Sequence, residues 1–142
     1  MKKLGFVFLF FLISEMMVSQ NLNEYRWKNR VLLLISQDTG SSDFKVQMNL
    51  LRSNINDLEE RKLVVLTILP HEYTVGLNEM SPWEKGDQVY LKYGEKEESF
   101  KVLLIGLDGG VKISQKEPIL VETLKEMIDI MPMRRSEIEN KN

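Results

Sequence analysis

The chain has 142 residues, of which 43% are hydrophobic and 28% are charged. This composition fits one globular domain and excludes a disordered polymer or an embedded membrane protein. The formal net charge of −2 excludes a strongly basic surface, so we expect no nucleic-acid partner. Because the chain contains no cysteine, disulfides, a lipid-modified cysteine and thiol-based chemistry by its own side chains are excluded.

The first segment has the order of a secretory signal peptide: two lysines, an apolar run at residues 4–13, and a more polar stretch that ends near Ser19. A membrane anchor is the alternative, but a spanning helix needs roughly 18 apolar residues or more. We therefore expect residues 1–19 to be a signal peptide, with a cut after Gln20 as another possible site. The mature protein would then be exported, periplasmic or extracellular, with no membrane span.

The next elements predict a strand, a helix and a second strand. Residues 31–35 form a continuous apolar run, which is typical of a central strand buried on both faces. Residues 37–42 predict a turn with a serine helix cap, and apolar side chains then recur at spacings of four and three over residues 44–58. One amphipathic helix ending near residues 61–62 and a second apolar run at 63–69 would complete a βαβ unit with parallel strands.

The segment 71–99 has little pattern, and we expect a connection containing a short helix or an edge strand. An apolar run at 100–107, two adjacent glycines and a shorter run at 111–113 predict a hairpin toward one edge of the sheet. A closing helix is expected to begin near Pro118 and to end at Pro132. Residues 136–142 are polar and are expected to be frayed.

Three motifs are distinctive: Trp27-Lys-Asn-Arg30, Leu104-Ile-Gly-Leu-Asp-Gly-Gly-Val-Lys112 and Met131-Pro-Met-Arg-Arg135. With them, residues 23–138 resemble the domain of unknown function 4174, which is also found in the extracellular vertebrate sushi-repeat and coiled-coil-domain-containing protein 80 group. The resemblance implies a single α/β domain with a thioredoxin-like or peroxiredoxin-like fold. The polar residues 139–142 are expected to form a tail after it. The resemblance implies no established activity and no catalytic residue. The motif residues are Trp27, Arg30, Gly106, Asp108, Gly109, Lys112, Met131, Pro132 and Met133.

Thioredoxin-like enzymes carry a reactive cysteine where the first helix begins, because the helix N-terminus favours the thiolate. Here that loop is Gln37-Asp-Thr-Gly-Ser-Ser42, and Ser99-Phe100 stands where thioredoxins keep a proline. Both departures argue against an oxidoreductase. Residues 38–42 also match the local signature of an aspartic protease, which needs two paired carboxylates. The chain has no second such loop, so a turn and helix cap is the favoured interpretation unless a homodimer pairs two copies.

Other candidates for chemistry are weak. His71 is the sole histidine, so neither a histidine metal cluster nor a Ser/His/Asp arrangement is supported, and we expect it in a loop. The glycines at 106–110 lack the spacing of a phosphate loop. No catalytic, metal-binding or cofactor-binding residue is therefore expected, and no cofactor.

Two aromatic side chains and three carboxylates have simple interpretations. Trp27 and Trp83 are expected to pack in the core, since aromatic residues bury well, although exposed binding anchors are the alternative. Glu95, Glu97 and Glu98 are expected to lie in a solvated loop.

Arg134 and Arg135 are the candidate binding residues. Under the favoured interpretation, Met131 and Met133 pack into the core and both arginines pair with carboxylates of the same domain. Under the alternative, the two guanidinium groups present a fork for a partner's carboxylates or another anion.

The leading functional hypothesis is a redox-inactive, thioredoxin-like binding or structural module outside the cytoplasm, with a protein or another envelope component as its partner. The alternative is an enzyme with a non-thiol site at the Asp38–Ser42 loop.

Overall fold

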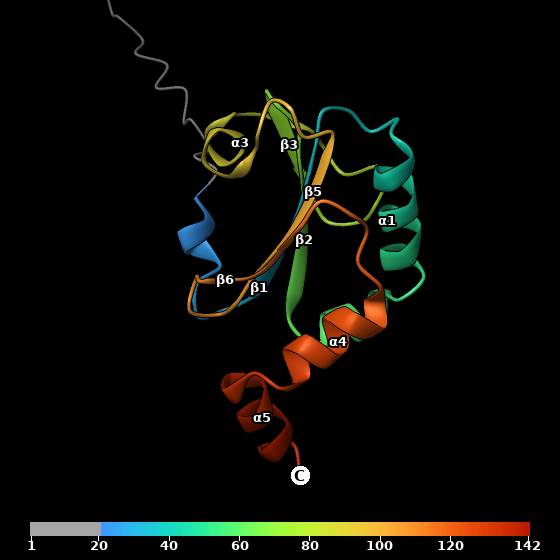
Figure 1. The fold of residues 1–142 in the computed structure, drawn as a ribbon. Helices are drawn as coiled ribbons and strands as arrows, with labels where there is room; N and C mark the ends of the chain where they lie inside the picture. The colour runs from blue at the N-terminus through green and yellow to red at the C-terminus, as the bar shows by residue number, and fades with distance from the viewer. Residues whose placement is uncertain (1–20) are drawn as a thin grey trace, which may run out of the picture.

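The computed structural model describes residues 21–142 as a six-stranded sheet with helices on both faces (Figure 1). The strand order is β4-β3-β2-β1-β5-β6. The expected signal peptide at 1–19 lies outside the described residues. The strands are β1 (Arg30–Ser36), β2 (Leu63–Ile68), β3 (Glu72–Val75), β4 (Glu84–Lys85), β5 (Phe100–Ile105) and β6 (Val111–Gln115). The helices are η1 (Leu22–Glu24), α1 (Ser42–Arg52), α2 (Ile55–Glu60), α3 (Gln88–Tyr93), α4 (Val121–Asp129) and α5 (Pro132–Glu139).

Strand β1 lies in the middle of the sheet, and every one of its residues is buried. It pairs with β2 in parallel and with β5 antiparallel, so Leu33 lies beside both Leu66 and Leu103. Strand β6 closes one edge as the second strand of the hairpin. The predicted central strand, the parallel βαβ unit and the hairpin at the sheet edge are confirmed.

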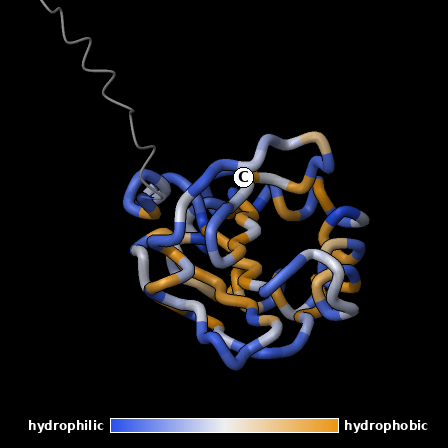
Figure 2. Tube along the Cα trace, turned by 90° about the horizontal axis from the view of Figure 1, so that it is seen from above, coloured by the Kyte–Doolittle hydropathy of each residue, from blue (hydrophilic) through white to orange (hydrophobic). Residues whose placement is uncertain are grey.

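The sheet separates two hydrophobic cores because alternate side chains of β1 point to opposite faces. Leu32 and Leu34 belong to the core beneath α1, α2 and α4. Leu33 and Ile35 belong to the core beneath α3 and the N-terminal segment. Figure 2 shows the corresponding pattern, with hydrophobic segments inside and hydrophilic ones around the rim.

The single helix predicted between β1 and β2 is wrong, because α1 and α2 are separate. Asn54 has φ −133° and ψ 27°, outside the helical region. The Ser53 hydroxyl donates to the Asn49 carbonyl at 2.9 Å, and the Asn54 amide donates to the Leu50 carbonyl at 2.9 Å. The Asn54 side chain satisfies the Leu50 carbonyl, which the end of α1 leaves open, and the Ser53 hydroxyl adds a second bond to the Asn49 carbonyl, so both favour a break at this point.

The predicted closing helix corresponds to α4, which ends at Asp129, shortly before Pro132, but the expectation that it is the last helix is wrong. Met131 has extended backbone angles, and Pro132 occupies the first turn of α5, where its missing N–H costs little. Residues up to Glu139 are therefore helical rather than frayed. Helix α5 follows α4 at the end of the molecule where β1 begins (Figure 1).

The segment 71–99 contributes more structure than its sequence suggested. Strand β3 pairs antiparallel with β2, the short β4 closes that edge, and α3 covers the second core. His71 lies in the exposed turn before β3, as predicted.

The expectation that both tryptophans pack in the core is wrong. The exposed fraction of Trp27 is 60%, and that of Trp83 is 41%. Trp27 follows η1, and Trp83 precedes the edge strand β4, so each lies at the rim of the sheet. The guanidinium of Arg26 lies 5.4 Å from the centre of the Trp27 ring, a cation–π contact that an exposed indole can make.

One of the three loop carboxylates departs from the expected solvated state. Glu95 and Glu97 are exposed, but the side chain of Glu98 is 7% exposed. Its carboxylate pairs with Lys116 at 2.5 Å and with Lys101 at 3.5 Å. The hydrogen bond from Lys116 outweighs burial and holds the pKa of Glu98 below its usual value.

Candidate functional site

The Asp38–Ser42 loop, at the carboxyl end of β1, is closed by its own hydrogen bonds. The Asp38 carboxylate accepts from the Gly40 N–H at 2.6 Å, and the Ser41 hydroxyl accepts from the Phe44 N–H at 3.3 Å. The Ser36 hydroxyl donates to the Asp38 carbonyl at 2.6 Å. The loop therefore forms the expected turn and helix cap.

A pocket of about 240 Å³ lies beside this loop, between α1 and the β2–β3 pair. Thr39 is the one loop residue in its lining. Thr67 on β2 also lines the pocket, and its buried hydroxyl has no hydrogen-bond partner within residues 21–142. Glu79 is the single carboxylate in the lining, and it pairs with Arg52 at 2.9 Å. General acid–base catalysis needs a positioned, available proton donor or acceptor, and this lining offers only a carboxylate already bound to an arginine.

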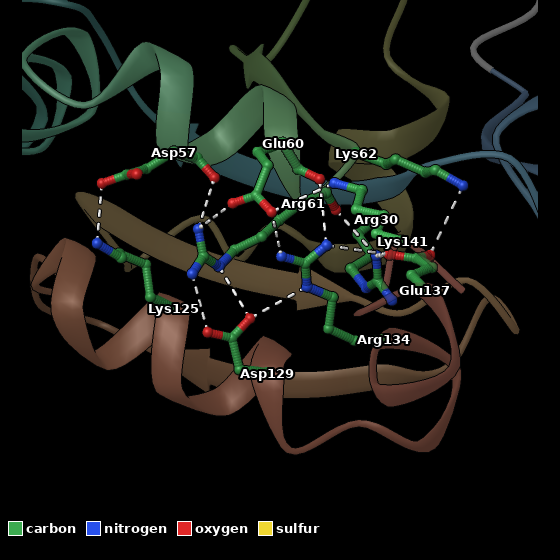
Figure 3. Close-up of polar contacts among 10 residues, drawn as sticks. All are labelled: Arg30, Asp57, Glu60, Arg61, Lys62, Lys125, Asp129, Arg134, Glu137 and Lys141. Carbon is green, nitrogen blue, oxygen red and sulfur yellow. Dashed lines mark hydrogen bonds and ion pairs between the residues drawn. The ribbon is translucent and has the colours of Figure 1, made fainter. Parts of the chain in front are cut away.

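The opposite end of β1 carries a charged group that we call the arginine cluster (Figure 3). Three arginines with exposed fractions of 0%, 7% and 2% are held among three carboxylates. They come from β1, from the residue that follows α2, and from α5, while the carboxylates come from α2, α4 and α5. The members are Arg30, Arg61, Arg134, Glu60, Asp129 and Glu137.

Asp129 joins two of the arginines. Its carboxylate accepts two hydrogen bonds from Arg61, from Nε at 3.0 Å and from Nη2 at 2.8 Å. It also accepts from Nε of Arg134 at 3.2 Å, while Nη2 of Arg134 donates to Glu60 at 2.8 Å. The two-point contact between Arg61 and Asp129 is strong and directional, so it fixes α4 against the end of α2, and the bonds of Arg134 link α5 to both helices.

The cluster holds its carboxylates in the charged form. Burial acts to raise the pKa of Asp129, but hydrogen bonds from Arg61 and Arg134 outweigh it and lower that pKa. The hydrogen bond from Arg134 likewise lowers the pKa of Glu60. For Arg134, burial acts to lower the pKa, and the hydrogen bonds to Glu60 and Asp129 reverse this and raise it.

The two arginines proposed for binding are separated by the structure. Arg134 is 2% exposed and belongs to the cluster, whereas Arg135 is exposed and has no ion pair with another residue of the described chain. Met131 packs partly buried against the core, but the expectation that Met133 packs there is wrong, because its side chain is 42% exposed. The expectation of a carboxylate partner holds for Arg134 and is wrong for Arg135 within the described residues. Neighbouring positions of a helix point to different sides, so α5 turns Arg134 inward and leaves Arg135 on the surface.

Arg30 is fully buried, and only part of its guanidinium is bonded. Nη1 donates to the Arg61 carbonyl at 2.9 Å and to both carboxylate oxygens of Glu137 at 3.3 Å. Nε and Nη2 are buried without a hydrogen-bond partner among the described residues. A buried donor left in this state costs about 1–3 kcal/mol, so two on one side chain require an explanation.

A pocket of about 80 Å³ adjoins Arg30. Its lining brings together the three sequence motifs, which lie far apart in the chain. All the motif residues except Trp27 and Gly109 contribute to it. The lining consists of Arg30, Gly106, Leu107, Asp108, Lys112, Met131, Pro132 and Met133.

The remaining motif residues shape the loop that forms one wall. The Trp27 N–H donates to the Leu107 carbonyl at 2.7 Å, and Gly109 has a φ of 83°, which favours glycine. The Asp108 carboxylate accepts from the Gly110 N–H and from Lys112 Nζ, each at 2.9 Å. A Cβ on Gly106 would lie 2.7 Å from Lys112 Cε, so the lysine chain folds across this glycine.

Sequence reasoning found the motif residues but missed most of the cluster. Arg61 and Asp129 are 68 residues apart, Arg134 and Glu60 are 74 apart, and Arg30 and Glu137 are 107 apart. No local spacing could have paired these residues. The nearest signal was the buried strand, whose first residue is a charged Arg30.

Within residues 21–142, no group of three or more histidine, aspartate or glutamate side chains is placed to hold a metal ion. None of the described helices is both long and apolar enough to cross a membrane.

The strand order, the parallel βαβ unit and the final hairpin with its closing helices define a thioredoxin-like domain. In the solved structures, the reduced 2-Cys peroxiredoxin of Plasmodium vivax is similar, with a TM-score of 0.60 and 15% sequence identity. The match covers 82% of this chain and 85% of the peroxiredoxin chain, and at this identity it shows the fold alone. The model of the domain of unknown function DUF4174 matches residues 21–137, and the chain belongs to this family. No curated protein matches the chain.

Proposed function

We propose that this chain is a redox-inactive, thioredoxin-like binding module that acts outside the cytoplasm, with the pocket beside Arg30 as its binding site. The observation that carries the proposal is the convergence of three distant motifs on one pocket, above a buried arginine with two unpartnered donors. Buried donors in folded proteins nearly always have a hydrogen-bond partner, so two donors without one suggest that the partner is a ligand.

Redox inactivity is supported by two features of the chain. It has no cysteine, so it has no thiolate to attack a peroxide or a disulfide. In the loop before α1, the Asp38 side chain stabilises a turn and the Ser41 side chain caps the helix. Export is supported by the basic, apolar and polar order of residues 1–19.

The pocket beside Arg30 favours binding over catalysis. Apart from Arg30, its charged side chains are bound to each other, since Lys112 donates to Asp108 at 2.9 Å. The other walls are methionine, proline, leucine and glycine. Such a lining can hold and orient a ligand, but it presents no nucleophile activated by a neighbouring base.

A comparison of two variants tests the binding role. Tagged mature protein is used to capture partners from the native cell envelope, with Met133→Asp at the pocket and Met80→Asp as the matched control. Met80 is 87% exposed and does not line the pocket. We expect Met133→Asp to lose captured material that the wild type and Met80→Asp retain. Equal capture by all three proteins would contradict a binding site at this pocket.

Redox inactivity and export have their own measurements. We expect no turnover of insulin disulfides or hydrogen peroxide above a buffer control. Turnover that disappears in Asp38→Ala or Ser41→Ala would instead support an enzyme with a non-thiol site at that loop.

Export is tested by N-terminal sequencing of native protein. We expect the sequence obtained to begin near residue 20 or 21, and an intact N-terminus in the inner-membrane fraction would contradict export.

A further inference from the structure

We propose that Arg30 binds a carboxylate group of the ligand through Nε and Nη2, with a short apolar part of the ligand in the adjoining pocket. This inference rests on the proposed function, because it names the ligand chemistry of the same site.

The geometry of the guanidinium supports a two-point contact. Nη1 of Arg30 is engaged by the Arg61 carbonyl and by Glu137. In the planar guanidinium, the N–H bonds of Nε and Nη2 point to the same side, which is the edge that matches a carboxylate. Arg61 uses this same edge to hold Asp129, at 3.0 and 2.8 Å. Arg30 thus leaves without a partner the edge that its neighbour uses for a carboxylate of the protein. Because both nitrogens are buried, a ligand reaches them only when the side chains that cover them move.

No carboxylate of the cluster is available for that edge. Asp129 is held by Arg61 and Arg134, and Glu60 is held by Arg134. Glu137 contacts Arg30, but through Nη1, and it also pairs with Lys62 at 3.7 Å. Asp108, the carboxylate that lines the pocket, is bound to the Gly110 N–H and to Lys112. We therefore infer that the carboxylate for Arg30 comes from a ligand.

The pocket limits what carries this carboxylate. Its volume of about 80 Å³ accommodates a group of only a few heavy atoms. Leu107, Met131 and Met133 give it apolar walls, and Met133 is exposed enough to form its entrance. These walls favour a single negative charge on a short aliphatic group over a strongly hydrated phosphate. A free short-chain acid and the C-terminus of a peptide both present this chemistry.

The Arg30 Nε–H resonance reports the contact directly in ¹⁵N-labelled mature protein. We expect sodium propionate to shift this resonance in a saturable manner, while propionamide and sodium chloride do not. Propionamide has nearly the same shape without the charge, and chloride controls for ionic strength. No saturable shift with propionate, or an equal shift with chloride, would overturn the proposal.

Two variants at the site and one control variant distinguish loss of binding from loss of folding. Arg30→Lys keeps the positive charge but lacks the two-donor edge, and we expect about tenfold weaker propionate binding or more. Met133→Phe narrows the entrance and leaves Arg30 intact, so it should also weaken binding. Arg135→Lys, on the exposed side of α5, should bind like the wild type. Wild-type affinity in both Arg30→Lys and Met133→Phe would overturn the proposal.

A crystal structure grown with propionate separates a ligand from solvent. A carboxylate on Nε and Nη2 supports the proposal, whereas a water alone on these atoms at saturating propionate overturns it.

Short peptides with free or amidated C-termini then distinguish the two sources of the carboxylate, a peptide C-terminus and a free short-chain acid. Tighter binding of the free-terminus peptide than of propionate indicates a chain terminus, and the reverse indicates a small acid. If propionate fails while envelope capture still depends on Met133, the binding module stands and only its ligand class is wrong.

Discussion

The two ends of β1 differ in how they satisfy their polar groups. At the carboxyl end, the Asp38–Ser42 loop bonds to itself and to the first turn of α1. At the amino end, Arg30 is buried among side chains from α2, α4 and α5, and two of its donors remain without a partner. The loop that begins the first helix is thus closed by its own hydrogen bonds, whereas the opposite end of the strand keeps two buried donors without a partner among the described residues.

The two ends of β1 also differ in the sequence separation of the residues that hold them. The loop's internal hydrogen bonds join residues within three positions of one another, while the cluster includes pairs separated by 68 to 107 positions. A change in the loop should therefore weaken one helix start. A change in the cluster should loosen the docking of several elements at once.

The largest effect is expected when Arg134 is removed from the cluster. Arg134→Ala takes away the hydrogen bonds to Asp129 and Glu60 and leaves a space in a buried site. We expect the free energy of unfolding to fall by about 3 kcal/mol, whereas Arg135→Ala should change it by less than about 0.5 kcal/mol. Urea denaturation of both variants measures this. Equal effects at the two positions would show that the buried pairing does not stabilise the domain.

The pH dependence of stability provides a test of intermediate size. Folding lowers the pKa of Asp129 and Glu60 from 3.8 and 4.5. Groups with a depressed folded pKa contribute stability above the unfolded pKa and lose it as pH falls through the folded value. We expect the free energy of unfolding to decline below about pH 4, and Asp129→Asn to be less stable at neutral pH but less dependent on pH. An unchanged slope in Asp129→Asn would exclude Asp129 as a source of the dependence.

The smallest effect is expected in the loop. Ser41→Ala removes the hydroxyl that accepts from the Phe44 N–H, so the domain should lose about 1 kcal/mol. Thr39→Ala, a substitution in the same loop that removes no helix cap, serves as the control. Chemical denaturation compares the two variants, and a loss near that of Arg134→Ala would show that the loop has a larger role than capping.

The sequence was sufficient for the centre of the fold. The unbroken apolar run of β1 and the later run of β2 indicate buried parallel strands, because only central strands are apolar on both faces. The division between α1 and α2 was not predictable from apolar spacing, since the stripe continues across Ser53 and Asn54. Pro132 was equally ambiguous, because proline suits both the residue after a helix and the first turn of the next one.

The candidate site was predictable only as a set of motif residues. Their convergence depends on the register that brings the start of β1 beside the end of β5 and on the turn that returns α5 to this end. The cluster depends on distant charge pairs, which a single sequence does not specify. Trp27 and Trp83 were expected in the core because of their size, but their places at the sheet rim leave them exposed.

The most direct test of the account compares propionate-induced stabilisation at the two ends of β1. Thermal unfolding is followed with and without propionate in the wild type, Met133→Phe and Ser41→Ala. We predict that propionate raises the melting temperature of the wild type and of Ser41→Ala by the same increment, and that this increment is smaller in Met133→Phe. An increment that persists in Met133→Phe and disappears in Ser41→Ala would contradict the account, because the ligand would then bind at the loop.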